Sequence, residues 1–155
     1  MAIQYDDYVY KLSTEAPQPE FSIVLPKDLQ WADEFDWDPI SQFVEYGTTG
    51  SLLIQESTKL KGRSITLIGT DNMAWLTRSQ VETLIQMRNS IGLIMDFSFV
   101  RKDNHSISLF TFKTMFRHAD VAFEGLPIKH WDQYEPNAYY IIRSIKLMET
   151  LPFGE

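Results

Sequence analysis

Histidines and carboxylates are the residues of this chain whose types and spacing could support metal binding or acid–base catalysis. His118 and Asp120 stand two positions apart, as in a metal site or a proton relay. A catalytic zinc site uses three protein ligands, and the other histidines, His105 and His130, form no HExxH motif. The chain has no cysteine, so thiolate nucleophiles and cysteine-ligated zinc are excluded. We therefore expect no metal site, and we expect His118 to make a local turn contact or to pair with an acid across an interface.

Carboxylate pairs are the second possible chemistry. Asp71 could form an acid–base couple with Glu82 or Glu124, and two carboxylates are the minimum for glycoside hydrolysis. With 21 acidic residues among 155, one such pair is expected by chance. There is no Gly-x-Ser-x-Gly elbow, and Gly47–Gly50 lacks the following lysine of a phosphate-binding loop. The sequence favours a protein that is not an enzyme and holds no cofactor; a small cell-wall hydrolase remains an alternative.

Aromatic side chains could instead bind sugars or bases by stacking on them. Trp131 lies in the polar stretch HWDQY and is the best candidate for an exposed anchor, whereas Trp75 is expected to fill the core. We expect Trp131 to contact another subunit. A carbohydrate-binding or receptor-binding module that uses Trp131 or Trp37 is a further alternative.

Size and composition indicate a packed globular protein. The chain has 155 residues, of which 44% are hydrophobic and 14% aromatic. That length buries about two-thirds of the surface of the unfolded chain. No apolar run approaches the roughly 18 residues that span a bilayer, and the first residues do not have the pattern of a secretory signal. We expect synthesis in the cytoplasm and no insertion in a membrane.

The negative charge is concentrated in residues 1–40, which hold nine acids and two lysines. Residues 41–155 hold twelve acids and twelve bases, so they offer no basic surplus for a nucleic-acid backbone. We interpret residues 1–40 as an acidic, aromatic N-terminal arm and residues 41–155 as a single β-rich domain. Sequence-independent DNA binding needs such a basic surplus and is not expected.

The arm is rich in aromatic residues, which acidic disordered tails are not. One possibility is that it wraps its own domain and fills grooves there. The other is that it reaches a neighbouring subunit with aromatic anchors. In the second case the expected interface residues, with one residue of the domain added, are Tyr5, Tyr8, Tyr10, Trp31, Trp37 and Trp131.

One helix with well-marked ends is expected over residues 77–91. Thr77 and Gln80 have the spacing of a capping box, and Leu76 stands where a hydrophobic staple needs it. Gly92 can end the helix in the left-handed conformation. These signals are local, so they predict the helix without knowledge of the rest of the fold.

Strand patterns occupy most of the remaining chain. They cover residues 21–26, 42–46, 51–57, 59–69, 93–100, 107–116 and 139–148. Short turns between them, including Gly47–Gly50, indicate antiparallel pairing. The expected fold is α+β and mainly β: an antiparallel barrel or sandwich of about six to seven strands with the helix against one side.

Four short motifs, taken in order, resemble those of small tail and baseplate proteins of bacteriophages. They cover roughly the C-terminal two-thirds of the chain and are Gly62–Leu67, Trp75–Arg78, Phe116–His118 and Leu147–Glu149. The resemblance implies a tail-tube-like β-barrel with a flanking helix, whose sheets join edge to edge around a ring.

For function, the resemblance implies a structural subunit of the virion, not an enzyme. Its expected role is to form a homo-oligomeric, hexameric ring between tail tube and hub. The partners would be copies of itself and the tube and hub proteins. DNA would pass through the channel without specific binding.

Overall fold

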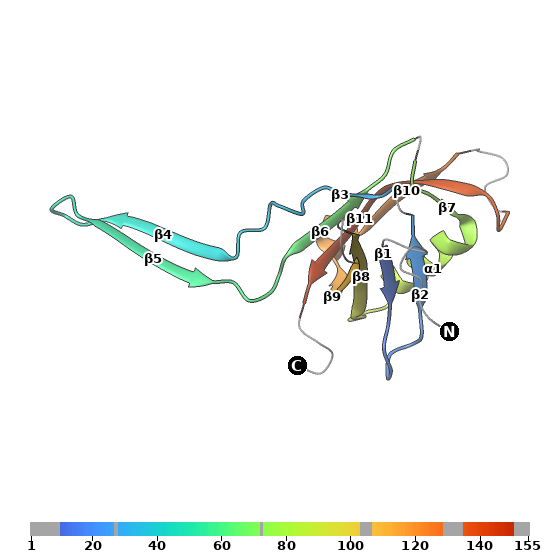
Figure 1. Cartoon of the computed structure of the whole chain (residues 1–155), viewed down its shortest axis with the longest axis horizontal. Helices are drawn as coiled ribbons and strands as arrows, with labels where there is room; N and C mark the ends of the chain where they lie inside the picture. The colour runs from blue at the N-terminus through green and yellow to red at the C-terminus, as the bar shows by residue number, and fades with distance from the viewer. Residues whose placement is uncertain (1–9, 27, 72, 103–106, 129–134, 151–155) are drawn as a thin grey trace.

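The computed structural model describes residues 10–26, 28–71, 73–102, 107–128 and 135–150. Within these ranges the protein is mainly β, with antiparallel strands and one α-helix (Figure 1). Besides a short 3-10 turn at His118–Asp120, the elements are β1 (Tyr10–Ser13), β2 (Ser22–Leu25), β3 (Gln30–Trp31), β4 (Ile40–Tyr46), β5 (Leu52–Thr58), β6 (Ser64–Ile68), β7 (Trp75–Thr77), α1 (Arg78–Arg88), β8 (Met95–Lys102), β9 (Ile107–Phe116), β10 (Phe123–Pro127) and β11 (Tyr139–Glu149).

Nine of these strands form one sheet. We call this sheet and α1 together the body. The strands run in the order β2-β1-β8-β9-β11-β6-β3, and β7 and β10 also pair with β11. The sheet is not closed into a barrel. Of the two predicted forms, barrel and sandwich, the barrel is therefore wrong. The sheet curls instead: Trp31 on β3 meets Phe97 and Phe99 on β8 edge to face, with ring centroids 5.9 and 5.3 Å apart. This arrangement is compatible with a sandwich.

The number of strands is larger than the six or seven expected. The additional strands are short: β1 has four residues, β3 two, β7 three and β10 five. Alternation between apolar and polar residues needs a longer run to be recognised. These strands are defined by pairing with distant parts of the chain, which a local pattern does not contain.

The helix forms where the local signals placed it. The Thr77 side chain accepts from the Gln80 backbone N–H, and the Gln80 side chain accepts from the Thr77 backbone N–H at 3.0 Å, so the capping box is confirmed. The helix ends at Arg88, three residues before the expected end. Gly92 has a φ of +70° and follows shortly after. Val81, Leu84 and Met87 are buried on the inner side of the helix.

Residues 10–31 contribute three strands to the body. β1 pairs with β8 and β3 pairs with β6, so the boundary expected at residue 40 separates strands that pair with one another. Leu12, Leu25 and Leu29 belong to the buried core. Residues 10–31 are therefore built into the body, while residues 1–9 lie outside the described residues.

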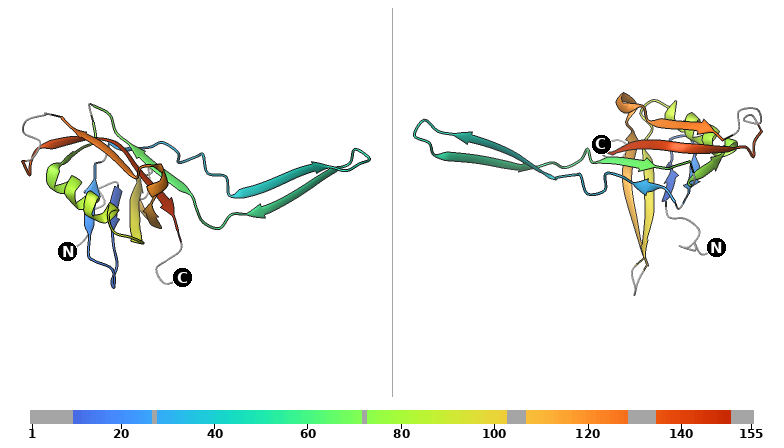
Figure 2. Two further views of the ribbon diagram at one scale, coloured as in Figure 1. Left: turned by 180° about the vertical axis from the view of Figure 1, so that it is seen from behind. Right: turned by 90° about the horizontal axis from the view of Figure 1, so that it is seen from above.

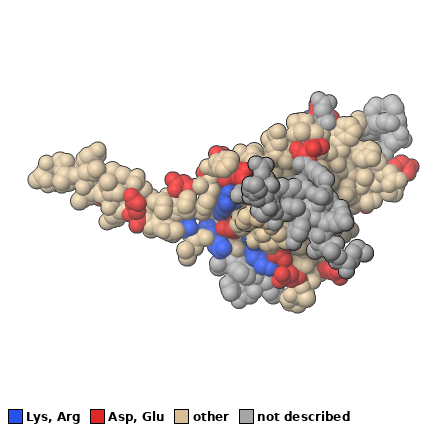
Figure 3. Space-filling model, in the orientation of Figure 1, with Lys and Arg blue, Asp and Glu red and all other residues tan. Residues whose placement is uncertain are grey.

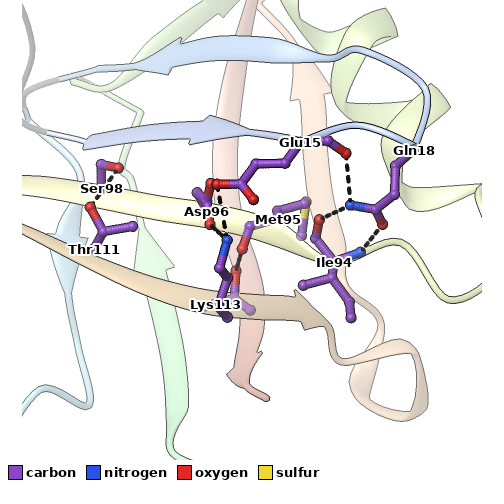
Figure 4. A network of polar contacts seen from close by, with 9 residues as sticks. Glu15, Gln18, Ile94, Met95, Asp96, Ser98, Thr111 and Lys113 are labelled. Atoms are coloured by element: carbon purple, nitrogen blue, oxygen red, sulfur yellow. Dashed lines mark hydrogen bonds and ion pairs between the residues drawn. The ribbon is translucent and has the colours of Figure 1, made fainter. Parts of the chain in front are cut away.

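The turn between β1 and β2 is attached to the start of β8 by polar contacts (Figure 4). The Gln18 side-chain amide donates to the Ile94 carbonyl oxygen and accepts from the Ile94 backbone N–H, both at 2.8 Å. The Lys113 amine on β9 lies 2.6 Å from an Asp96 carboxylate oxygen and 3.2 Å from Glu15. The bond to Asp96, and less strongly that to Glu15, raises the pKa of Lys113.

Candidate subunit interface

The hairpin formed by β4 and β5 stands apart from the body. It is a two-stranded sheet of its own, and neither strand pairs with any other described strand. Figures 1 and 2 show it projecting well away from the body. At its tip the Gly47 N–H donates to the Ser51 carbonyl at 2.8 Å, and Gly50 adopts a φ of +84°. At its base the Lys59 N–H donates to the Pro39 carbonyl at 2.7 Å.

The two faces of this hairpin differ in character. Residues directly opposite each other in an antiparallel pair share a face. One face, which we call the apolar face, carries Ile40, Val44, Tyr46, Leu52 and Ile54. The only polar cross-strand pair between them is Gln42 and Glu56, joined by a hydrogen bond of 2.9 Å. The other face mixes Phe43 and Leu53 with polar residues.

All seven large apolar side chains of the hairpin are exposed, from 42% for Ile40 to 71% for Tyr46. An isolated two-stranded hairpin is at best marginally stable in water, and soluble monomers rarely expose contiguous apolar patches of this kind. Residues 40–58 also contain no lysine, arginine or proline to protect the open strand edges. Figure 3 shows the same contrast, since Lys and Arg colour the body but not the hairpin. The hairpin therefore has the chemistry of a surface that another molecule covers.

The six residues that the sequence suggested for an interface have different positions. Tyr5, Tyr8 and Trp131 lie outside the described residues. Tyr10 stacks on Phe97 at 5.7 Å inside the body. Burial, followed by the nearby Glu34 carboxylate, raises the pKa of Tyr10.

Trp31 and Trp37 complete that set. Trp31 packs edgewise on Phe97, Phe99 and Phe112 within this chain, because the curled sheet brings β3 over β8 and β9. Trp37 lies near the base of the hairpin, with the Lys59 amine 5.1 Å from its ring centre. Tyr10 and Trp31 thus serve internal packing, and Trp37 alone adjoins the projecting hairpin.

The carboxylates considered for catalysis are only partly brought together. Glu82 and Glu124 line one groove between α1, β10 and β11, which we call the helix groove, but Asp71 is not among its lining residues. The Glu82 carboxylate is bound to the Arg78 Nε at 2.9 Å. The Asp71 carbonyl accepts from the Trp75 indole at 3.2 Å. The groove therefore does not bring Asp71 together with either glutamate, the couple considered for a hydrolase.

His118 and Asp120 lie in the short 3-10 turn that follows β9. Asp120 pairs with the Arg117 guanidinium, and the His118 ring lies 6.1 Å from the Phe116 ring. Within the part of the chain that the structure describes, no group of three or more histidine or acidic side chains is placed to hold a metal ion. His118 thus has a local contact at the turn.

The sequence predicted the hairpin but not its position. Its turn and both strands were expected, whereas its separation from the sheet was not. The sequence did contain a signal of this separation. The adjacent residues Phe43 and Val44 place apolar side chains on both faces of β4, and residues 40–58 contain no basic residue. A strand that is apolar on both sides must be covered on both sides.

Among the described residues, no helix has the length and apolar character needed to cross a bilayer.

Comparison of this chain with protein-family models, with curated proteins and with solved structures finds no match.

Proposed function

We propose that this protein is a structural subunit of a bacteriophage tail or baseplate, which assembles with copies of itself into a ring. The four motifs of the sequence support the virion context. The observation that carries self-assembly is the projecting hairpin, whose seven large apolar side chains are all exposed. In a ring, each subunit would bury its hairpin against the next one.

The body and the hairpin have separate roles in this proposal. The curled sheet with α1 supplies a preformed unit, and we propose that it follows the tail-tube plan of a β-structure with a flanking helix. The hairpin supplies the joint between units. Burial of its apolar side chains gives the favourable free energy of association.

The partners of the ring, and the passage of DNA through it, follow from the same proposal. The ring would number six subunits and connect tail tube and hub in the virion. Residues 41–155 have equal numbers of acidic and basic residues, which suits a channel wall along which DNA slides, because a basic wall would hold the phosphates.

The test is the native mass of the purified protein by light scattering over a range of concentrations, followed by electron microscopy. We expect rings, or a mass that rises with concentration towards a ring. The double variant Val44→Thr, Ile54→Thr makes the apolar face more polar while keeping β-branched side chains. We expect it to remain monomeric, with the circular dichroism spectrum of the wild type.

The matched control is Ser41→Thr, Ser57→Thr, a cross-strand pair on the opposite face of the same hairpin. It should assemble as the wild type does. A wild-type protein that stays monomeric at every concentration contradicts self-assembly. Rings that survive in the Val44→Thr, Ile54→Thr variant show that another surface joins the subunits.

A further inference from the structure

We infer that the apolar face of the hairpin docks in the helix groove of a second copy of this chain. The inference rests on the proposed self-assembly and adds the surface that receives the hairpin. Three features of the described residues carry it: the shape and lining of the groove, the charges on the two surfaces, and their places at opposite ends of the molecule.

The helix groove is a preformed hollow with an apolar floor. It has a volume of about 620 Å³, and its apolar lining is Val81 and Ile85 on α1, Phe123 on β10 and Tyr140 on β11. The Arg78 guanidinium connects the α1 and β11 sides of the groove. It donates a hydrogen bond to the Tyr140 hydroxyl on β11 at 2.7 Å and forms an ion pair with Glu82 on α1. A floor of this composition can accept the side chains of the hairpin's apolar face.

The charges of the two surfaces have opposite sign. Residues 40–58 carry two acids, Glu45 and Glu56, and no bases. The groove is lined by three arginines and by two glutamates, which leaves it one positive charge in excess. Of the hairpin acids, Glu56 lies on the apolar face. Docking of that face therefore brings a carboxylate towards a surface with one surplus positive charge, and complementary charges of this kind fix orientation.

Position excludes the chain's own groove. Figures 1 and 2 show the hairpin extending from one end of the body and α1 lying at the other, in every view. β4 has seven residues, which is about 23 Å of extended strand, and it points away from α1. The contact must then be made between molecules, from the hairpin of one copy to the groove of the next.

Such a contact joins two different surfaces and is heterologous. Repetition of a heterologous contact generates a closed ring when its rotation closes, and an open filament when it does not. A hairpin and a groove at opposite ends of one subunit therefore give a head-to-tail contact, which is the kind of contact that the proposed ring requires. A symmetric dimer would need one surface that contacts itself.

The test uses the absence of cysteine from the sequence, so that every disulfide reports an engineered pair. Tyr46→Cys places a thiol on the apolar face, and Gln86→Cys places one on the exposed side of the groove. The two single variants are mixed, oxidised mildly and analysed by mass spectrometry. We expect a mixed disulfide dimer in at least tenfold excess over the dimer from the control mixture.

The control pairs Tyr46→Cys with Val24→Cys, an exposed position on β2 at the end of the sheet. It also tests the main alternative, in which the hairpin adds to that open edge. A mixed dimer with Gln86→Cys alone supports the inference. Equal dimers from both mixtures, a dimer with Val24→Cys alone, or none at all overturn it.

A charge exchange gives a second reading that does not depend on disulfides. Glu56→Arg and Arg143→Glu each reverse one charge, both at exposed positions. Each single variant should associate about tenfold more weakly, and the double variant should recover most of that loss. Without recovery in the double variant, this orientation in the groove is wrong. Rings in light scattering combined with no groove crosslink would overturn the docking site and leave the proposed function standing, whereas the absence of all assembly removes both.

Discussion

The two long hairpins of this protein have similar local structure and opposite surroundings. The hairpin of β8 and β9 lies inside the main sheet, where Met95, Phe97 and Phe99 are buried. The hairpin of β4 and β5 extends into solvent and pairs with neither the body sheet nor the helix among the described residues. Both have a continuous antiparallel register. Their difference therefore does not arise from strand formation.

The difference arises from which faces are apolar. On β8, Met95, Phe97 and Phe99 alternate with Asp96 and Ser98, so that up to Phe99 one face is apolar and the other is polar. On β4 the adjacent residues Phe43 and Val44 place apolar groups on both faces. A strand with one apolar face is satisfied by the core of its own domain. The β4–β5 hairpin needs covering on both sides, and a chain of this size offers one core only.

The largest expected effect is the contrast between two deletions, one in the body and one of the projecting hairpin. Removal of residues 1–40 deletes β1, β2 and β3, including the core residues Leu12 and Leu25. We expect this variant to show no cooperative unfolding transition. Replacement of residues 40–58 by a short Gly-Ser turn should leave a folded body, because Pro39 and Lys59 are already joined by a hydrogen bond.

Thermal denaturation monitored by circular dichroism measures both variants. Folding of the chain without residues 1–40 would show that the first strands are dispensable, against their place in the sheet. Loss of folding in the Gly-Ser variant would show that the β4–β5 hairpin belongs to the folding unit, as the β8–β9 hairpin does.

A single substitution in each hairpin sharpens the comparison. Phe97→Ala removes a fully buried ring of β8 and should lower the free energy of unfolding by about 3–5 kcal/mol. Phe43→Ala removes a ring of β4 that is 59% exposed and should change it by less than about 0.5 kcal/mol. Denaturant unfolding at low protein concentration measures both, since association would otherwise add to the apparent stability. Equal losses would place the β4–β5 hairpin in the cooperative core.

Local signals predicted the parts of this fold that local chemistry determines. The capping box of Thr77 and Gln80 set the start of α1, and β9 has the bounds that its pattern indicated, Ile107–Phe116. The strand expected over 59–69 begins only at Ser64. Gly62 has a φ of +105° and interrupts the extended backbone there, while its N–H donates to the Glu149 carbonyl at 3.0 Å.

The remaining features depend on contacts between distant residues. β3 is two residues long and exists because it pairs with β6, and the curl of the sheet follows from the packing of Trp31 on β8. Trp31 and Tyr10 were suggested for an interface because aromatic residues in an acidic segment have the composition of exposed anchors. The sequence does not reveal that β1 pairs with β8 and β3 with β6. These pairings bring Tyr10 and Trp31 against Phe97, where both are partly buried.

The smallest expected effect is a dependence on pH that is confined to the body. The Lys113 amine binds Asp96 and Glu15, which raises its pKa in the folded protein. Its contribution to stability is therefore complete below the pKa of a lysine side chain in the unfolded chain, about 10.4. It is lost as the pH rises through the higher folded value, because the folded state then holds more protons than the unfolded one.

Tyr10 acts in the same direction, since burial raises its pKa and keeps it neutral. Lys113→Met should lower stability by about 1 kcal/mol at pH 8, because the pair is partly exposed, and should make the decline between pH 8 and pH 11 shallower than in the wild type. Urea unfolding across that range measures the slopes. Gln42→Met, at the polar pair of the β4–β5 hairpin, is the control and should leave the slope unchanged. Parallel slopes in Lys113→Met and wild type would show that Lys113 does not hold β8 to β9 through its charge.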